Sequence, residues 1–468
     1  MNFIEHSDFW NAVMAFPMIK RMLALSLKKC EGCGRQVLDS AFDWYLGLSA
    51  RKCEKCSVPS NVIIFWIEFL RRNLAIERSK VEKILVDPYA RRGIKSVVKT
   101  FIHLGIRKPL TVYAPFLVVW DFTYRCNLNC KHCYSNASVY AGKELETKEA
   151  LKVVDQLADF GVVSLAFSGG EPLMRKDFFE VAKHAVDSGL YVSLATNGTL
   201  LNKQTVQRLK EIGIHYVEVS VDGSDAKFHD AFRGVPGAFD LAVQGLKNCV
   251  EQDLCASVAV TATKENFKDI PQILELAEKI GAKRFALFNF VPTGRGAQMA
   301  SQDLSPEERE EIMIFLLGRL LSGSKVAILT TTPQLARVAV SHQGGLSEVF
   351  IPMAHMQTSR VSKKAVALAD FIGGCGAGRL YCSISPEGEV HPCVFLPIKV
   401  GSLKTDTFGD LWLNSKVFQV LRNRENLKGS CGECQFKYVC GGCRARAYAY
   451  TRDILASDPG CILVKKCT

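Results

Sequence analysis

The sequence predicts an α/β protein whose central part is a partial (β/α)6 TIM-type barrel. Six short apolar segments between residues 116 and 290 have the composition of buried strands. Amphipathic segments with helical periodicity separate them. Near-continuous apolar strands joined by helical crossovers form parallel sheets, and six such units suit a partial barrel.

The expected strands are short and follow one another in a regular order. They are FLVVWDF (116–122), VVSLAF (162–167), LYVSLAT (190–196), HYVEVSV (215–221), CASVAVTA (255–262) and RFALFNF (284–290). Helical segments such as KEALKVVDQLADFG and NFKDIPQILELAEKIG lie between them, and the second is expected to end at Gly281. In barrel-like sheets the chemistry collects on the loops that follow the carboxyl ends of the strands.

The composition is that of a folded protein with large cores. The chain has 468 residues, of which 48% are hydrophobic and 23% charged. The N-terminus lacks the pattern of a signal sequence, and the longest apolar run, 62–66, is too short for a membrane span, so we expect a cytoplasmic protein. The net charge of +12 is scattered, which favours an anionic substrate and predicts no nucleic-acid partner.

The first part of the chain is expected to be helical and basic, and it contains a cysteine module. The chain divides into a helical region, the barrel and a cysteine-rich part: residues 1–110, 111–335 and 336–468. The module has two C-x2-C pairs, Cys30 with Cys33 and Cys53 with Cys56, at zinc-ribbon spacing. We expect a structural Zn2+ here, although rubredoxin-type iron would use the same ligands. The helices that follow are expected to pack on the barrel, with peripheral membrane contact as the alternative.

The loop after the first expected strand carries three cysteines. In TYRCNLNCKHCYSNA, Cys126, Cys130 and Cys133 have C-x3-C-x2-C spacing. Four thiolates usually complete a tetrahedral site, so three leave one position for another group. The glycine-containing loops SGGEP, TNG and SVDGS follow the next three strands, and glycine lets a ligand approach backbone N–H groups closely.

The C-terminal part is also rich in cysteine. The cysteines between residues 375 and 443 lie in two stretches, CGAGRLYCSISPEGEVHPC and CGECQFKYVCGGC, and Cys461 follows them. Secreted disulfide scaffolds are usually small and lack large cores, whereas this chain is large. The clustering therefore favours metal ligation over a disulfide framework.

On these motifs the chain resembles the radical S-adenosylmethionine (SAM) superfamily over residues 116 to about 295. The resemblance implies that Cys126, Cys130 and Cys133 hold a [4Fe–4S] cluster whose fourth iron binds SAM. An external reductant such as ferredoxin or flavodoxin would then drive cleavage of SAM to a 5′-deoxyadenosyl radical that abstracts a substrate hydrogen. The SAM-binding residues that it implies are Gly169, Gly170, Glu171, Asn197, Ser220 and Arg233.

The C-terminal cysteines resemble those of a SPASM domain, which carries auxiliary [4Fe–4S] clusters. Their interlaced pattern implies two clusters, so that the chain would hold three in all. The implied ligand sets are Cys375, Cys382, Cys393 and Cys443 for one cluster, and Cys431, Cys434, Cys440 and Cys461 for the other. The first of these clusters, being fully ligated, is expected to accept an electron from the substrate radical and not to bind substrate.

The amino-acid sequence of this C-terminal part most resembles that of the radical SAM enzymes of heme synthesis. This implies an anionic tetrapyrrole substrate whose propionate side chains are oxidised or decarboxylated. The alternative is a maturase that modifies a ribosomal peptide; sulfatase-type maturases place a carboxylate base where this chain has Val394. A third class, an electron-transfer or scaffold protein, would have no need of a three-cysteine site beside SAM-type loops.

Overall fold

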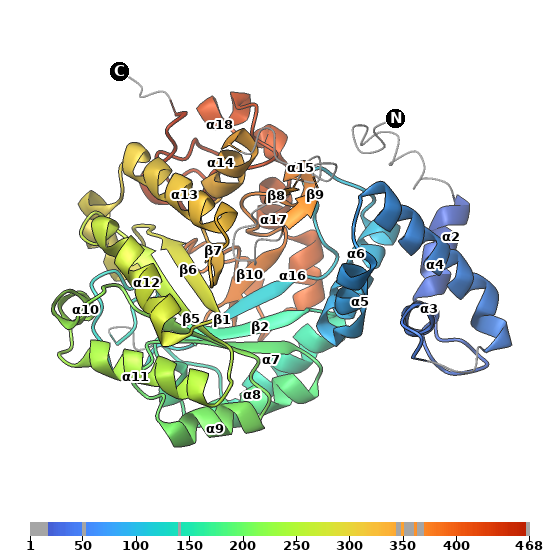
Figure 1. Ribbon diagram of the computed structural model, residues 1–468, viewed down its shortest axis with the longest axis horizontal. Coiled ribbons are helices and arrows are strands. Elements are labelled where there is room, and N and C mark those ends of the chain that lie inside the picture. Colours follow the sequence, from blue (N-terminus) through green and yellow to red (C-terminus); the bar gives the residue numbers. More distant parts are fainter. Residues whose placement is uncertain are drawn as a thin grey trace.

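The computed structural model describes residues 17–48, 53–138, 142–342, 348–350, 360–362 and 369–464 (Figure 1). Its centre is a ten-stranded sheet with the strand order β12-β11-β10-β1-β2-β3-β4-β5-β6-β7. The six predicted strands are all present and parallel, and the α/β barrel prediction is confirmed. They are β1 (Leu117–Thr123), β2 (Ser164–Gly169), β3 (Tyr191–Thr196), β4 (Tyr216–Ser220), β5 (Ala256–Ala262) and β6 (Arg284–Asn289).

Further strands extend the sheet at both edges. At one edge β7 (Ala327–Thr330) pairs in parallel with β6. At the other edge β10 (Tyr381–Ile384) pairs in parallel with β1, followed by the antiparallel strands β11 (Glu389–His391) and β12 (Gly401–Ser402). A separate ribbon pairs β8 (Glu348–Phe350) with β9 (Arg360–Ser362). The cysteine-rich part therefore shares one sheet with the barrel.

Helices cover the outer face of the barrel sheet (Figure 1). They are α7 (Thr147–Phe160), α8 (Phe178–Asp187), α9 (Lys203–Glu211), α11 (Ala238–Glu251), α12 (Ile270–Ile280), α13 (Pro306–Leu321) and α14 (Gln334–His342). The short helix α10 (Ala226–Arg233) packs beside the loop that follows β1, and the 3-10 turns are η1 (Pro172–Met174), η2 (Phe267–Asp269) and η3 (Gly294–Gln302). Helix α12 ends at Gly281, whose φ of 86° is left-handed, as the sequence predicted.

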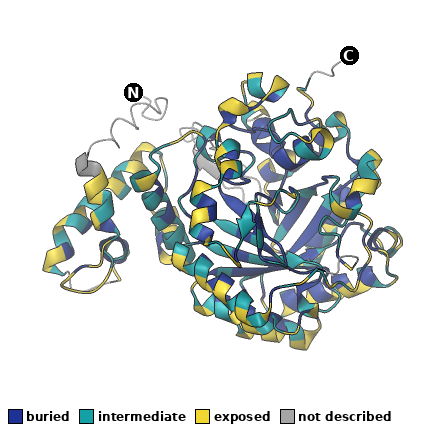
Figure 2. Cartoon of the chain, turned by 180° about the vertical axis from the view of Figure 1, so that it is seen from behind, coloured by how far each residue is buried: buried dark blue, intermediate teal, exposed yellow. Residues whose placement is uncertain are grey.

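The main core lies between the strands and these helices. Outward-facing strand residues such as Val118, Trp120 and Phe122 are fully buried against the helix layer. Figure 2 shows the same arrangement, with buried strands inside helices whose outer faces are exposed. Short helices complete the C-terminal part: α15 (Ala369–Ile372), α16 (Phe408–Asn414), α17 (Lys416–Arg422), η5 (Arg424–Asn426), α18 (Gly429–Glu433) and α19 (Arg444–Thr451).

The N-terminal region forms a group of helices beside the barrel (Figure 1). They are α2 (Pro17–Ser26), α3 (Val37–Tyr45), α4 (Glu54–Asn73), α5 (Arg78–Val86) and α6 (Pro88–His103). Helix α6 packs on the barrel: Arg92 Nε donates to the Val162 carbonyl at 2.6 Å, and Ser96 Oγ donates to the Ala114 carbonyl at 2.7 Å. Helix α4 keeps Phe65 and Trp66 exposed. Within the described ranges, none of the helices has the length and apolarity needed to cross a membrane.

Candidate active site and metal centres

A cavity of about 560 Å³ lies inside the barrel. Alternate residues of each strand face inward, and many of these positions hold small side chains. Ala166, Ser193, Ala195, Ala259 and Ala286 all line the cavity. A closed TIM barrel fills this space with branched side chains, whereas here it stays open. Its volume is within the range of about 300–1,000 Å³ that small-molecule sites have.

The three cysteines of the loop after β1 line one end of this cavity. The Leu128 N–H donates to Cys126 Sγ and the Ala137 N–H donates to Cys133 Sγ, both at 3.4 Å. Burial, and then the charges of neighbouring groups that include Cys130 and Cys133, raise the pKa of Cys126 to about 11. Three neighbouring thiols, two of which accept backbone N–H donors at their sulfur atoms, fit an iron–sulfur cluster, which binds them as thiolates.

Gly169 and Gly170 bring the loop after β2 directly against the three-cysteine loop. A Cβ atom at Gly169 would lie 2.7 Å from the Thr123 carbonyl oxygen, and one at Gly170 would lie 2.2 Å from that of Arg125. Both contacts are with backbone, which cannot move aside, so a larger residue does not fit. Both glycines line the cavity, as expected of ligand-binding positions.

Glu171 lies behind this loop and holds the next one in place. Its buried carboxylate accepts hydrogen bonds from Thr196 Oγ1 at 2.8 Å, the Asn197 N–H at 2.9 Å and the Leu173 N–H at 3.2 Å. Burial raises the pKa of Glu171 to about 7. These donors occupy the carboxylate, whereas Asn197 itself lines the cavity and donates to Asn127 Oδ1 at 2.8 Å. In this structure the side chain of Glu171 positions Asn197.

Ser220 and Arg233 complete the predicted SAM-binding set. Ser220 ends β4 and lines the cavity. Arg233 ends α10, where its guanidinium lies 2.6 Å from Asp222 and donates to Cys130 Sγ at 3.6 Å. Burial opposes the charge of Asp222, but Arg233 and His132 outweigh it and lower the pKa of that carboxyl. Arg233 is therefore a fixed charge beside the cysteine loop.

A buried polar group that the sequence analysis did not identify lies next to this site. Tyr134 donates its hydroxyl hydrogen to Asp121 Oδ1 at 2.8 Å and lies 2.9 Å from Ser168 Oγ. Burial raises the pKa of Asp121 to about 7, against the effect of the Tyr134 hydrogen bond. The signal for Asp121 was present: it is an acidic residue inside an apolar strand, on the same face as the cavity-lining Val119.

The other end of the cavity meets helix α6 of the N-terminal region. Tyr89 lies in the cavity wall, 2.7 Å from His215 Nε2 and edge-on to Tyr191. Beside them Tyr216 donates to Glu218 Oε2 at 2.9 Å, and burial raises the pKa of Glu218 to about 7. This contact joins residues far apart in the chain, so no local pattern could predict it.

One group of auxiliary cysteines lies next to the barrel. Cys375, Cys393 and Cys443 line a small cavity that shares wall residues with the barrel cavity. The structure does not bring Cys382, the fourth member of the predicted set, to them. Cys382 is fully buried in the core on the other face of β10, with the charged group of Arg422 as its neighbour. Three of the four predicted ligands converge.

The second auxiliary group lies further toward the C-terminus. Cys431, Cys440 and Cys461 are close enough for their charges to interact. Backbone N–H groups of Asp458 and Gly442 donate to Cys431 Sγ and Cys440 Sγ, each at 3.4 Å. Cys434 ends α18, three residues after Cys431, and accepts from the N–H of Phe436. This arrangement fits a cluster with cysteine ligands.

A fully buried ion pair connects the two auxiliary groups. Arg446 Nε lies 2.7 Å from Asp458 Oδ1, and neither side chain has any exposed surface. Asp458 Oδ2 accepts from the Cys443 N–H at 2.7 Å, while the Asp458 N–H donates to Cys431 Sγ. Arg446 also donates to Asn289 Oδ1 at the end of β6. The pair therefore contacts both cysteine groups and the barrel.

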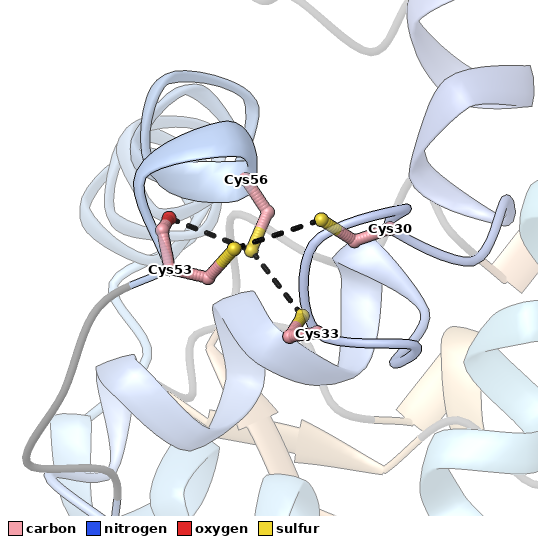
Figure 3. Close-up of side chains that lie close together, drawn as sticks. All are labelled: Cys30, Cys33, Cys53 and Cys56. Carbon is pink, nitrogen blue, oxygen red and sulfur yellow. Dashed lines mark hydrogen bonds between the residues drawn. The ribbon is translucent and has the colours of Figure 1, made fainter.

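The four N-terminal cysteines point toward a common centre (Figure 3). Their sulfur atoms lie within 4.8 Å of one another, with Cys30 3.7 Å from Cys53 and Cys33 3.8 Å from Cys56. Four sulfur ligands about 2.3 Å from a tetrahedral Zn2+ are about 3.8 Å apart. Backbone N–H groups of Gly32 and Cys33 lower the pKa of Cys30 to about 7, which favours the thiolate. The geometry fits a closed tetrahedral site.

Residues 120–277 match the family model of the radical SAM superfamily, and residues 375–435 match the SPASM iron–sulfur cluster-binding domain. The open barrel and its three-cysteine loop define a radical SAM enzyme with an auxiliary-cluster domain. The chain belongs to the radical SAM superfamily, with a [4Fe–4S] cluster and SAM as the cofactors that this domain implies.

Two proteins of similar sequence and one solved structure of similar fold are informative. The chain is 40% identical to the AdoMet-dependent heme synthase of Methanosarcina barkeri, over 75% of this chain and 97% of that protein. It is 33% identical to the pre-heme d1 synthase of Dinoroseobacter shibae, over 74% and 86%. Streptococcus suis SuiB bound to its precursor peptide SuiA shares the fold with a TM-score of 0.62 and 17% identity, over 91% and 92%.

Proposed function

We propose that this enzyme oxidises or decarboxylates propionate side chains of a tetrapyrrole by SAM-dependent radical chemistry. The observation that carries the proposal is the open barrel cavity, which the three-cysteine loop borders at one end. The 40% identity to a heme synthase, which extends over nearly that whole protein, supports this substrate class. An external reductant such as ferredoxin or flavodoxin would supply the electron.

The chain's own residues would bind and orient the reactants. Bound at the cluster, SAM would supply a 5′-deoxyadenosyl radical, the species that removes a hydrogen atom from the substrate. Gly169, Gly170, Asn197 and Ser220 would hold SAM against the cysteine loop, because they line the cavity there. The small inward side chains of the strands leave room for a flat macrocycle, and the net charge of +12 attracts its carboxylates.

The substrate can be tested with an iron porphyrin that carries propionates, such as iron coproporphyrin III. Reconstituted enzyme, SAM and dithionite should convert propionate groups to vinyl groups. Each conversion releases CO2, gives one hydrogen atom to the 5′-deoxyadenosyl radical and gives one electron to an oxidised auxiliary cluster. Mass spectrometry measures the product, and 5′-deoxyadenosine should form in proportion. Enzyme without SAM is the control.

A different result would point to the other substrate class. If 5′-deoxyadenosine forms while the porphyrin is recovered unchanged, the tetrapyrrole proposal fails. A peptide, as in SuiB, is then the remaining candidate, and exposed Phe65 and Trp66 on α4 offer a surface for a precursor or a membrane.

We further propose that the N-terminal cysteines hold a structural Zn2+. Cys33→Ser should lose the metal and destabilise the N-terminal helices, because three ligands no longer close the tetrahedron. It should leave SAM cleavage unchanged, because the residues predicted to bind SAM line the far end of the barrel cavity. Zinc analysis and limited proteolysis measure the effect, and Cys255→Ser, outside the module, is the control. A Cys33→Ser protein that keeps one zinc per chain would refute the site.

A further inference from the structure

Strand β10 presents two neighbouring residues, Tyr381 and Cys382, to opposite faces of the sheet. The pairing with β1 fixes which face each residue takes: Tyr381 is opposite Leu117, and Cys382 is opposite Val118. Leu117 lines the barrel cavity, whereas Val118 is buried in the outer core. Because cross-strand partners share a face, Tyr381 faces inward and Cys382 faces the helix layer.

The surroundings of Cys382 are those of a core residue. Its side chain has no exposed surface and packs in the main core between the sheet and helices. Its charged neighbour is Arg422 of α17, which donates to the carbonyls of Gly378 at 2.7 Å and Trp412 at 2.6 Å. A cluster ligand would have to leave this core and pass through the plane of the strand.

Tyr381 occupies the inward position at the cluster site. Together with Cys375, Cys393 and Cys443 it lines the small cavity, and its hydroxyl donates to Cys393 Sγ at 2.8 Å. The remaining wall there consists of glycine, proline, apolar residues, Asn289 and Thr331. Asn289, Val291, Thr331 and Phe395 belong to the walls of both cavities, so the site lies directly beside the barrel cavity.

We propose that the auxiliary cluster beside the barrel has three cysteine ligands, Cys375, Cys393 and Cys443, and a fourth iron without a protein ligand that is accessible from the barrel cavity. That iron would take a small anionic donor, such as a carboxylate, and Tyr381 would tune the cluster through its hydrogen bond to Cys393. The expected fourth ligand, Cys382, is thereby replaced by an open coordination position, while the expected role of this cluster as electron acceptor stays a prediction. This inference does not depend on which substrate the enzyme uses.

Iron content separates the two ligand sets. Cys382→Val, which fills the core but cannot ligate iron, should keep the wild-type iron content after anaerobic reconstitution. Cys393→Ala should lose about four irons per chain, the content of one [4Fe–4S] cluster. Cys382→Ala provides a second, smaller replacement in case valine disturbs the packing. Loss of about four irons from the folded Cys382 variants would overturn the proposal.

Spectroscopy tests the open iron directly. When Cys126, Cys130 and Cys133 are all replaced by Ala, only the auxiliary clusters remain in the protein. Cyanide added to the reduced variant can then bind only to an open iron of an auxiliary cluster. The electron paramagnetic resonance spectrum should shift, and the shift should vanish when Cys375 and Cys393 are also replaced. An unchanged spectrum with cyanide would overturn the open position.

Tyr381→Phe removes the hydrogen bond but not a ligand. The variant should keep all its iron, and the reduction potential of this cluster should fall, because hydrogen bonds to sulfur stabilise the reduced cluster. A redox titration followed by the same spectra measures it. Loss of iron would instead make Tyr381 a ligand, and an unchanged potential would remove its tuning role; either result contradicts the assignment.

Discussion

Replacing Cys126, Cys130 and Cys133 together by Ala is expected to abolish SAM cleavage and to remove about four irons per chain. These three side chains border the cavity and pack together, and they are the predicted ligands of the SAM-binding cluster. Without them SAM has no iron to bind, so no 5′-deoxyadenosine should form above the background of dithionite and SAM alone. Chromatography of the nucleoside and iron analysis measure the two effects.

The control is Cys249→Ala, which removes a fully buried cysteine of helix α11 in the apolar core. It should cost some stability but leave both the iron content and SAM cleavage as in the wild type. A triple variant that still cleaves SAM would show that another site carries the chemistry. A triple variant that loses all its iron would show that the auxiliary sites depend on the first cluster.

Asp458→Asn is expected to destabilise the C-terminal part by about 3–5 kcal/mol, the cost of leaving a buried charge without its partner. Arg446 is fully buried and pairs with both Asp458 oxygens, at 2.7 and 3.0 Å. The same carboxylate accepts the Cys443 N–H, so the variant should also bind less iron at both auxiliary sites. Urea unfolding and iron analysis provide the measurements.

Asp453→Asn is the matched control, because its partner Lys428 is largely exposed. Surface ion pairs contribute about 0–1 kcal/mol, so this variant should retain its iron and nearly all its stability. Equal effects of the two replacements would mean that the buried pair has no special role between the cysteine groups.

The barrel was predictable because its strands carry apolar or small side chains on both faces, one packed on the helices and one lining the cavity, and therefore appear as near-continuous apolar runs. The ends of those runs also placed the glycine loops and the three-cysteine loop at one rim. β7 and β10 were not predicted, because each has only four residues. β10 also gains its place from pairing with β1, which is distant in the chain.

The spacing of the cysteines in the sequence predicted which cysteines gather at each site, but it could not predict the direction in which each side chain points. Cys382 has a regular place in the pattern of eight, yet the register of β10 against β1 turns it into the core. For Glu171 the motif predicts a contact with SAM, which stays a prediction, and the structure adds its hydrogen bonds to the neighbouring loop. Tyr89 reaches the cavity wall only because folding brings it to His215, which is 126 residues away in the chain.

The pairing of β10 with β1 has a consequence for how electrons move through the protein. The three-cysteine loop follows β1, and the auxiliary site surrounds β10, so adjacent strands of one hydrogen-bonded ladder support both. The two parts cannot swing apart on a hinge without breaking that ladder. Because electron tunnelling slows steeply with distance, a fixed separation would keep the rate of any electron transfer between the two sites constant throughout turnover.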